Sequence, residues 1–211
     1  MKQEIFPTTI WHSTYPYNIE AVAQAASTVQ LTPDLPNQVS MRQGLCSYNY
    51  IRNLHTRSEF ATLKEWINQE IQLYWQNLGY DSSRSARIKE MWLNVYPPGS
   101  WIDIHDHAPA PVVGTFYVQC EPGKANLILE HPLNILLKHQ PLAGLRDRGT
   151  YHDLNCHEIS ITTGDLVLFP GYLNHRSRPN SHNKDRIMIG VLIEQDFRAR
   201  INDRYRSMPG V

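Results

Sequence analysis

The pattern of polar and hydrophobic residues in the N-terminal part of the chain predicts two helices, a short one that follows a capping residue and a longer amphipathic one. Asn18 is a favourable N-cap residue, and we expect a short helix from Ile19 to about Ala26. A longer helix is expected from Ser58, as its cap, to about Leu78, because apolar residues recur there at helical spacing and would cover one face of a sheet. These residues are Phe60, Leu63, Ile67, Ile71, Tyr74 and Leu78. Gly79 would end this helix, and the stretch from Leu31 to about Arg57 between the two helices reads as irregular.

From Met91 onward the pattern changes to short runs of β-branched and aromatic residues that are separated by turn residues, which predicts strands. The expected strands are Met91–Tyr96, Trp101–His107, Val112–Gln119, Ala125–Leu129, His157–Thr162, Leu166–Phe169 and Arg186–Ile193. The connection from Asn134 to about Asn155 has no readable pattern. Helices followed by about eight short strands favour a mainly β fold with flanking helices. We expect a double-stranded β-helix, or jelly roll, with the N-terminal helices packed on one sheet.

Length and composition favour one domain. The chain has 211 residues, 41% of them hydrophobic, which suffices for a single core over residues 1–211. We expect a helical part at about 1–90, a β-helix core at about 91–195 and a basic tail at 196–211. Lys+Arg and Asp+Glu are equal at 20 each, so the charge balance shows no nucleic-acid or membrane signature.

The cellular location expected from the sequence is the cytoplasm. The N-terminus has no apolar signal segment, and no apolar run reaches transmembrane length. The three cysteines, Cys46, Cys120 and Cys156, are widely spaced, which argues against a disulfide framework or a zinc knuckle and fits a reducing compartment.

The most informative group of residues is His105-Asp106-His107 together with His175. Side chains alternate along a strand, so His105 and His107 are expected on one face, with Asp103 on the same face and Asp106 pointing away. Two neutral imidazoles can hold a divalent ion, and His175, just past a later strand, would supply the third ligand. Such a three-ligand site leaves open positions for substrate and oxygen, which iron oxygenases need.

Arg186 opens the last predicted strand, after His175. A buried arginine there could bind a carboxylate through two hydrogen bonds, and the alternative is an exposed arginine at the start of a strand. The remaining histidines are interpreted as structural or exposed, with His152 and His157 as weak candidates for the pocket.

Several segments together carry a resemblance to a known family. They are Ile5-Phe6-Pro7-Thr8, Met91-Trp92-Leu93-Asn94-Val95-Tyr96, His105-Asp106-His107, Gly114-Thr115-Phe116-Tyr117-Val118, Leu127-Ile128-Leu129-Glu130-His131-Pro132, Gly164-Asp165-Leu166-Val167-Leu168-Phe169-Pro170, His175 and Arg186-Ile187-Met188. In this order they resemble the 2-oxoglutarate/Fe(II)-dependent oxygenases, specifically a poorly characterised bacterial and phage family of about this length. A phage origin would place the protein in the host cytoplasm.

The resemblance implies a site for Fe(II), with 2-oxoglutarate as co-substrate and O2 as oxidant. His105 and His175 match the first and last iron ligands of the superfamily, and His107 stands where its carboxylate ligand usually stands. The third ligand is therefore left open between His107, water and Asp103. Arg186 matches the basic residue that holds the distal carboxylate of 2-oxoglutarate, while Met188 replaces the frequent Ser or Thr two positions later.

Further residues of the co-substrate pocket also follow from the resemblance. Tyr96 and Tyr117 match tyrosines that line this pocket in prolyl hydroxylases, and Asn94 and Trp92 are weaker candidates. The implied reaction couples oxidative decarboxylation of 2-oxoglutarate to hydroxylation of a substrate that the sequence does not identify.

Two other functions remain open at this point. A cupin-type metal dioxygenase without 2-oxoglutarate would fit the spacing of Gly99, His105 and His107, but the expected glutamate after His107 is absent and Arg186 would have no role. A non-catalytic β-helix protein is the other alternative. The oligomeric state is open, a homodimer included. The tail holds Arg198, Arg200, Arg204 and Arg206, which could bind an acidic partner but favour a solvated terminus.

Overall fold

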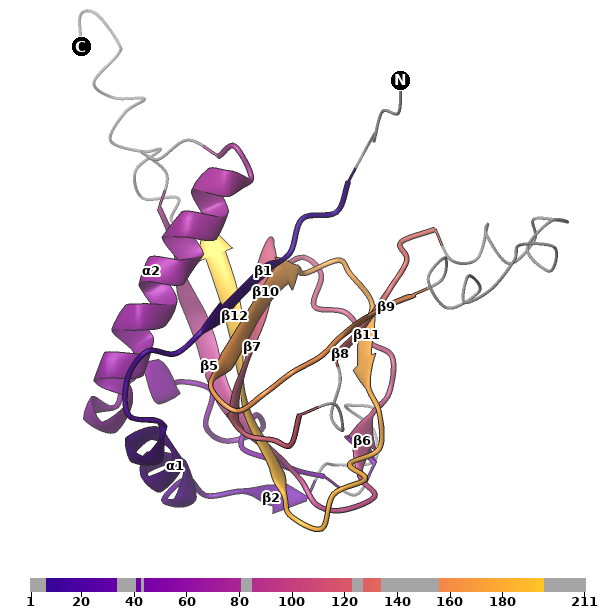
Figure 1. Cartoon of the computed structure of the whole chain (residues 1–211). Helices are drawn as coiled ribbons and strands as arrows, with labels where there is room; N and C mark the ends of the chain where they lie inside the picture. The colour runs from indigo at the N-terminus through magenta and orange to yellow at the C-terminus, as the bar shows by residue number, and fades with distance from the viewer. Residues whose placement is uncertain are drawn as a thin grey trace, which may run out of the picture.

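The computed structural model describes residues 7–33, 41–42, 44–80, 85–122, 127–133 and 156–195 (Figure 1). Its helices are α1 (Ile19–Ser27) and α2 (Ala61–Asn77), with two 3-10 turns, η1 (Leu54–Thr56) and η2 (Ser58–Phe60), before α2. The strands are β1 (Trp11–Thr14), β2 (Thr32–Pro33), β3 (Met41–Arg42), β4 (Leu45–Cys46), β5 (Ala86–Tyr96), β6 (Trp101–Ile102), β7 (Val112–Gln119), β8 (Leu127–Glu130), β9 (Cys156–Ile159), β10 (Asp165–Pro170), β11 (His175–Ser177) and β12 (Arg186–Gln195).

The strands form a large sheet and a smaller one. The large sheet has the order β1-β10-β7-β12-β5-β4-β2, the smaller one β11-β8-β9, and β3 pairs with β6. The paired strands run antiparallel, and strands distant in the chain are neighbours, as expected when a jelly roll winds two sheets together. The predicted mainly β, double-stranded β-helix fold is confirmed.

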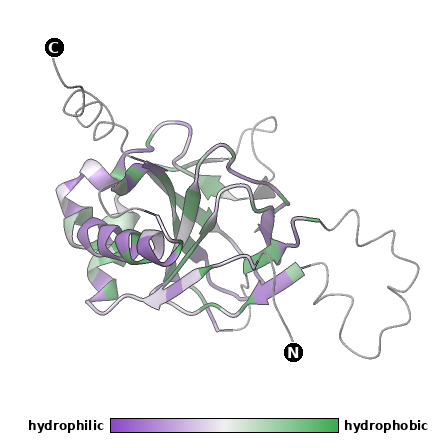
Figure 2. Cartoon of the chain, turned by 90° about the horizontal axis from the view of Figure 1, so that it is seen from above, coloured by the Kyte–Doolittle hydropathy of each residue, from purple (hydrophilic) through white to green (hydrophobic). Residues whose placement is uncertain are grey.

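Both faces of the large sheet are buried because helices cover one face and the second sheet covers the other. Leu93 and Val95 of β5 belong to the core beneath α1 and α2, whereas Tyr96 belongs to the core between the sheets. Figure 1 shows both helices on one side of the sheet, and Figure 2 shows hydrophobic colour on the central strands and hydrophilic stretches on the helices. The alternation along β5 therefore selects which side chains face the interior of the β-helix.

The predicted helices are present, with one wrong cap. Asn18 caps α1 as expected, since its Oδ1 accepts a hydrogen bond of 2.9 Å from the amide of Glu20. The helix expected from Ser58 begins as a 3-10 turn, and Ser58 makes no capping bond; its hydroxyl lies 3.1 Å from a Glu59 carboxylate oxygen. Gly79 follows α2 with a φ of +78°, a conformation that glycine adopts without strain.

Most of the predicted strands are present, and the differences concern their bounds and the segment that carries His105 and His107. β7 has the predicted bounds, whereas β5 begins at Ala86, earlier than expected. The strand expected over 101–107 is wrong beyond Ile102: His105 makes only an isolated bridge to His175. The stretch predicted to be irregular contains β2 and β4. The connection 134–155 and the tail 196–211 lie outside the described residues.

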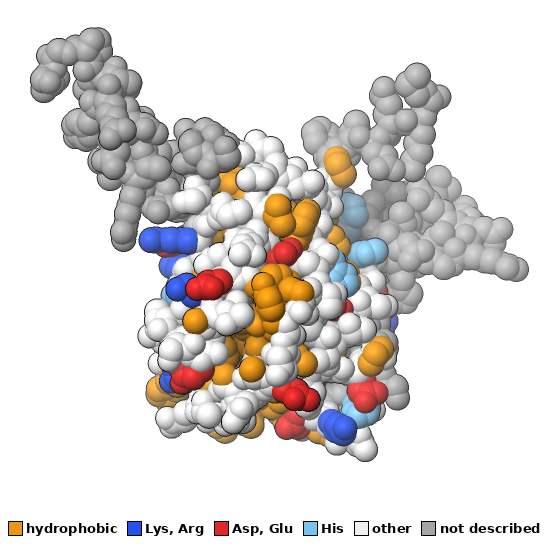
Figure 3. Space-filling model, turned by 60° about the vertical axis from the view of Figure 1, so that its left-hand side comes forward, with side chains coloured by type: hydrophobic (Ala, Val, Ile, Leu, Met, Phe, Trp, Pro, Cys, Tyr) orange, Lys and Arg blue, Asp and Glu red, His pale blue; other side chains and the backbone are white. Residues whose placement is uncertain are grey.

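Figure 3 shows the side of the molecule that carries the helices, where acidic and basic side chains are interspersed. No helix within the described ranges is long and apolar enough to cross a membrane.

Candidate metal centre

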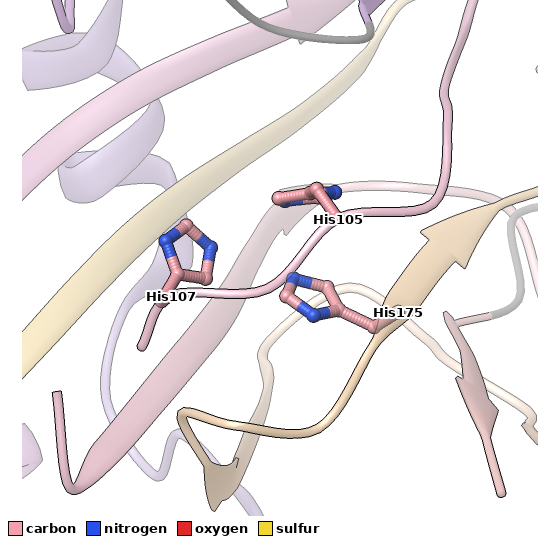
Figure 4. A group of neighbouring side chains, drawn as sticks. All are labelled: His105, His107 and His175. Carbon is pink, nitrogen blue, oxygen red and sulfur yellow. The ribbon is translucent and has the colours of Figure 1, made fainter. Parts of the chain in front are cut away.

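Three histidine side chains from two distant parts of the chain meet at one point. One ring nitrogen from each of His105, His107 and His175 lies within 4.8 Å of the others, and the ring centroids are 4.2 to 5.2 Å apart. Figure 4 shows the three rings turned toward one another, His175 from β11 and the other two from the segment before β7. No other cluster of this kind occurs among the described residues.

Backbone contacts bring the two segments together and orient two of the rings. The amide of His105 donates to the carbonyl of His175 at 3.0 Å, and the reverse bond is 2.8 Å. The Nδ1 of His105 lies 2.9 Å from the Asp103 carbonyl and that of His175 lies 3.0 Å from the Leu173 carbonyl. An Nδ1 that donates to a carbonyl leaves the lone pair on Nε2, which is the form that binds a metal.

All three imidazoles are held in the neutral form by their surroundings. Burial lowers the pKa of His105, although nearby backbone carbonyls and Asp106 oppose this effect. Burial and then the neighbouring His105 lower the pKa of His107 to about 4, and the same causes place the pKa of His175 well below its usual value. Neutral imidazole is required of a metal ligand, so the donor set fits a divalent transition metal.

Close backbone packing fixes the position of His107. Its amide donates to the carbonyl of Gly171 at 2.8 Å, and the amide of Gly171 donates to the carbonyl of Pro111 at 3.3 Å. A Cβ at Gly171 would lie 2.1 Å from the carbonyl oxygen of Ala110, so only glycine permits this approach. The segment 105–111 reaches the site through these contacts rather than through the strand that the sequence predicted.

The two nearby carboxylates are engaged elsewhere. Asp103 accepts a hydrogen bond of 2.7 Å from the indole of Trp101, and neither it nor Asp106 belongs to the cluster. Asp106 is exposed, as the alternation predicted, and accepts a bond of 2.9 Å from the amide of Ala108. Of the three ligand candidates left open by the sequence, His107 is the one that lies beside His105 and His175.

The histidines open into a cavity of about 260 Å³ inside the β-helix. Its lining includes the predicted residues Tyr96, Tyr117, Asn94 and Trp92. Asn94 is nine-tenths buried, and no hydrogen bond of its side-chain amide to another described residue occurs. Among the described residues that line the cavity, Asp106 and Arg176 are the acidic and the basic side chain. Most of the interior wall beside the histidines is therefore uncharged.

Trp92 lines this cavity, and Gly190 leaves room for its indole. The two residues are paired across β5 and β12, and a Cβ at Gly190 would lie 2.3 Å from an indole carbon. The indole centroid is 5.9 Å from the His107 ring and 5.1 Å from that of Tyr48. The weak candidate Trp92 is thus placed in the wall next to the histidines.

Arg186 is a buried cation behind two lining residues of the same cavity, Ser177 and Tyr96, with only 2% of its surface exposed. Its guanidinium lies 4.5 Å from the Tyr96 ring centroid and donates to the Ser177 hydroxyl at 2.8 Å and to the Arg178 carbonyl at 3.2 Å. Its Nε has no partner, and no carboxylate of the described residues pairs with it. Burial accordingly lowers the pKa of Arg186, against the favourable influence of Tyr96 and Tyr117.

The sequence did not single out Ser177, which lines the cavity and contacts Arg186. Arg186 itself is not a lining residue; it contacts Ser177 and Tyr96, which are. Ser177 follows His175 by two residues on β11, so the period of a strand would have placed both side chains on one face. The only sequence signal for it was this spacing.

The remaining candidates lie away from the cluster. His157 is exposed on β9, and His152 falls outside the described residues. No disulfide joins Cys46, Cys120 and Cys156 in the described part of the chain.

Comparison with known proteins places this site in a class. Residues 90–191, just under half of the chain, match the sequence model of a family described as "Putative 2OG-Fe(II) oxygenase". The matched segment includes His105, His107, His175 and Arg186. A comparison with curated proteins finds no significant match.

Several solved structures share the fold at low sequence identity. A prolyl-4-hydroxylase of Pseudomonas putida has 14% identity and a TM-score of 0.56, covering 88% of this chain and 92% of that one. HygX of Streptomyces hygroscopicus, with nickel, 2-oxoglutarate and hygromycin B bound, has 11% identity and a TM-score of 0.61, covering 90% and 84%. The epimerase SnoN from nogalamycin biosynthesis has 10% identity and a TM-score of 0.59, covering 89% and 78%.

The fold is that of the double-stranded β-helix class, and its three clustered histidines are a group that could hold a metal ion. Within that class, residues 90–191 carry the pattern of the 2-oxoglutarate/Fe(II) oxygenases. The resemblance that the sequence indicated is therefore confirmed.

Proposed function

We propose that this protein is an Fe(II)- and 2-oxoglutarate-dependent dioxygenase that hydroxylates a substrate not yet identified. The observation that carries the proposal is the closeness of two features: three histidines that line the cavity, and behind two other lining residues, Ser177 and Tyr96, a buried arginine without a carboxylate partner among the described residues. A buried cation is costly unless an anion compensates it. An anionic co-substrate that reaches both features supplies that compensation.

The family match and the similar structures support the same assignment. The matched family is an oxygenase family, and HygX was solved with nickel and 2-oxoglutarate bound. SnoN is described as an α-ketoglutarate-dependent epimerase, so hydroxylation is not the sole reaction on this fold. Analysis of the reaction product distinguishes hydroxylation from other outcomes for this chain. In the hydroxylation that we propose, 2-oxoglutarate, O2 and a C–H bond yield succinate, CO2 and an alcohol.

The residues of the chain have separate tasks in this reaction. His105, His107 and His175 would hold the iron, which when bound supplies the oxidising chemistry with O2 and the keto acid. Arg186 would compensate the distal carboxylate of 2-oxoglutarate. Tyr117 is buried beside it, and burial raises the pKa of its hydroxyl, so the phenol remains a neutral donor.

The same cavity would hold the reacting part of the substrate. Trp92 would exclude water beside the histidines, and Asn94 would add one amide to a largely apolar lining. An enclosed, water-poor site prevents side reactions of the oxidising metal.

A cupin-type dioxygenase without 2-oxoglutarate is the alternative within the same fold. It uses the three histidines equally well, but it gives no role to the buried charge of Arg186. For this reason the oxygenase assignment is preferred.

An anaerobic titration of the metal-free protein with Fe(II), followed by 2-oxoglutarate, tests the proposal. We expect a visible charge-transfer band from the chelated keto acid that saturates with 2-oxoglutarate. Iron binding without this band would support the cupin alternative, and no iron binding would support a non-catalytic role for the fold.

A further inference from the structure

The cavity wall beside His107 continues outward as a group of aromatic and charged side chains. Trp92 and Glu90 lie two residues apart on β5, so both side chains project from the same face of the sheet. Leu192, which is paired with Glu90, packs against the core between the two sheets, so this is the interior face. Trp92 lines the cavity, and Glu90, with 20% of its side chain exposed, lies one step beyond the lining.

The segment 47–53 places two more side chains over this face. Hydrogen bonds from its Ser47 amide and to its Arg52 carbonyl, of 2.9 and 2.8 Å, attach the segment to β5. Tyr48 of this segment lines the cavity, and its ring centroid is 5.1 Å from that of Trp92. We refer to Tyr48, Arg52, Glu90 and Trp92 as the mouth cluster.

The carboxylate of Glu90 is only loosely paired. Its Oε1 lies 3.7 Å from Arg52 Nη1, which is too far for a hydrogen bond, and its buried Oε2 has no hydrogen-bond partner among the described residues. A buried carboxylate oxygen without a donor is unfavourable. Half of the Arg52 side chain is exposed, so its guanidinium can turn into water at little cost. Glu90 is therefore able to accept a second, better placed cation.

Arg52 shows which kind of group this position accepts. Its guanidinium lies over the ring of Tyr48, 5.0 Å from the centroid, and beside the carboxylate of Glu90. An aromatic face and a carboxylate both attract organic cations, so the two together favour an ammonium or a guanidinium. A cation that donates to Glu90 Oε2 would make a contact that Arg52 does not make.

The charged groups of the cavity lining favour a cation as well. Arg176 is compensated by Glu130, whose Oε1 lies 2.7 Å from its Nε. Asp106 is exposed and accepts a hydrogen bond from a backbone amide, and within the described part of the chain no cationic side chain pairs with it. Asp106 and Glu90 together outnumber the single uncompensated cation, Arg52.

We propose that the primary substrate carries an alkyl chain ending in an ammonium or guanidinium group, and that the mouth cluster binds this cation. The cation would replace the Arg52 guanidinium over Tyr48 and donate to Glu90, while the chain extends along Trp92 toward the histidines. The indole ring is 5.9 Å from the His107 ring, so the hydroxylated carbon would lie several bonds away from the charge. This inference rests on the proposed function, whose substrate it describes.

Three probes of equal chain length test which charge the site prefers: hexylammonium, 1-hexanol and hexanoate. Calorimetry measures their binding to the protein loaded with Ni(II) and 2-oxoglutarate. We expect hexylammonium to bind about fivefold more tightly than 1-hexanol, and hexanoate to bind more weakly than either. Equal affinities for hexylammonium and 1-hexanol would overturn the proposal.

Two substitutions in the mouth cluster should act in opposite directions. Glu90→Gln keeps the shape and removes the negative charge, and it should weaken hexylammonium binding about fivefold without affecting 1-hexanol. Arg52→Gln removes the resident guanidinium and should strengthen hexylammonium binding. A site for anions predicts the reverse, namely a preference for hexanoate that Arg52→Gln abolishes, and this result would overturn the proposal.

A pair of variants at Tyr48 tests the aromatic face. Tyr48→Phe keeps the ring and Tyr48→Leu removes it. Hexylammonium should bind the leucine variant about threefold more weakly than the phenylalanine variant, while 1-hexanol binds both alike. Equal hexylammonium affinities would overturn the stacking of the cation on this ring.

Glu158→Gln is the matched control. Glu158 is a partly exposed carboxylate that pairs with Arg178 at 2.7 Å on the small sheet and does not line the cavity. This variant removes the same charge as Glu90→Gln and should bind hexylammonium as wild type does. An equal loss in both variants would overturn the proposal, since only the overall charge would then matter. Protein that prefers hexylammonium but binds neither iron nor the keto acid would instead overturn the proposed function.

Discussion

At the scale of single residues, the distinguishing feature of the site is that its three candidate metal ligands carry no negative charge. Three neutral imidazoles bring no negative charge to the metal, and the nearest carboxylates, Asp103 and Asp106, are bound to other groups. A divalent ion there would keep its full charge. An anionic co-substrate in the cavity would therefore interact favourably with the metal and with the nearby charge of Arg186.

His175 is the most buried of the three ligand candidates, and its removal should have the largest effect. We predict that His175→Ala loses Fe(II) binding, because two imidazoles hold such an ion poorly. The measurement is anaerobic calorimetry. His157→Ala, which removes an exposed histidine, should bind iron as wild type does, and iron affinity retained by His175→Ala would remove His175 from the site.

Arg186 should affect the co-substrate and not the metal. Arg186→Met keeps the length of the side chain and removes the buried charge. We predict unchanged Fe(II) affinity and at least about tenfold weaker 2-oxoglutarate binding, since a charged hydrogen-bonded contact of this kind contributes about 1.5–3 kcal/mol. Titration of the charge-transfer band gives both affinities, and an unchanged 2-oxoglutarate affinity would place the co-substrate elsewhere.

At the scale of elements, the loop from His105 to Pro111 is held by backbone contacts and not by a strand ladder. Gly171 is the point of closest approach. We predict that Gly171→Ala pushes this loop away, misplaces His107 and weakens metal binding by about tenfold to a hundredfold, the range seen when the support of a ligand is lost.

The control for this substitution is Gly164→Ala. Gly164 has a φ of +92° and its Cβ would only touch Thr14, so alanine there strains a turn far from the histidines. It should lower the melting temperature and leave metal affinity unchanged. Equal metal affinities in both variants would show that the loop adapts to a side chain at position 171.

The contact between β1 and β10 depends on the ionised carboxylate of Asp165. Burial acts to raise the pKa of Asp165, but hydrogen bonds from Thr162, Thr14 and His12 together lower it. A carboxyl whose pKa is lower in the folded state stabilises the protein above the unfolded pKa of about 3.9, and this contribution is lost as the pH falls through the folded pKa.

We therefore predict a pH-dependent difference between wild type and Asp165→Asn. Wild type should melt at a higher temperature at neutral pH, and the gap should narrow below about pH 4. Thermal denaturation monitored by circular dichroism measures both curves. A gap that stays constant down to about pH 3 would mean that the carboxylate charge contributes nothing to this contact.

At the scale of the whole molecule, the proposed metal would connect the two sheets. His175 belongs to the small sheet, and the segment with His105 and His107 leads into β7 of the large one. Metal that binds only the folded protein should therefore raise its melting temperature. The gain is about 2.7 kcal/mol at a concentration one hundred times the dissociation constant.

We predict two separate increments in melting temperature, one from Ni(II), as a redox-stable substitute for iron, and a further one from 2-oxoglutarate. Arg186→Met should keep the first and lose most of the second. An equal second increment in both proteins would argue against an anion site at Arg186.

Local patterns in the sequence determined a large part of this protein. The Asn18 cap predicted α1, helical spacing predicted α2, and a β-branched run predicted β7 with its bounds. These signals come from residues that are near one another in the chain. The H-x-H pair, the later histidine and Arg186 could also be named, since metal and carboxylate binding restrict the residue types that serve. The family resemblance implied that these residues belong to one site.

Tertiary structure alone decided how those residues meet. His107 reaches the site through the approach of Gly171 to the 105–111 segment, and Arg186 of β12 donates to the Ser177 hydroxyl of β11 in the other sheet. Both features depend on contacts between segments more than sixty residues apart, or between different sheets, which a local pattern does not record. The residue types of the site could be predicted from the sequence, because metal and carboxylate binding restrict which side chains can serve. The contacts that these residues make could not be predicted, because they depend on how distant strands pack against one another.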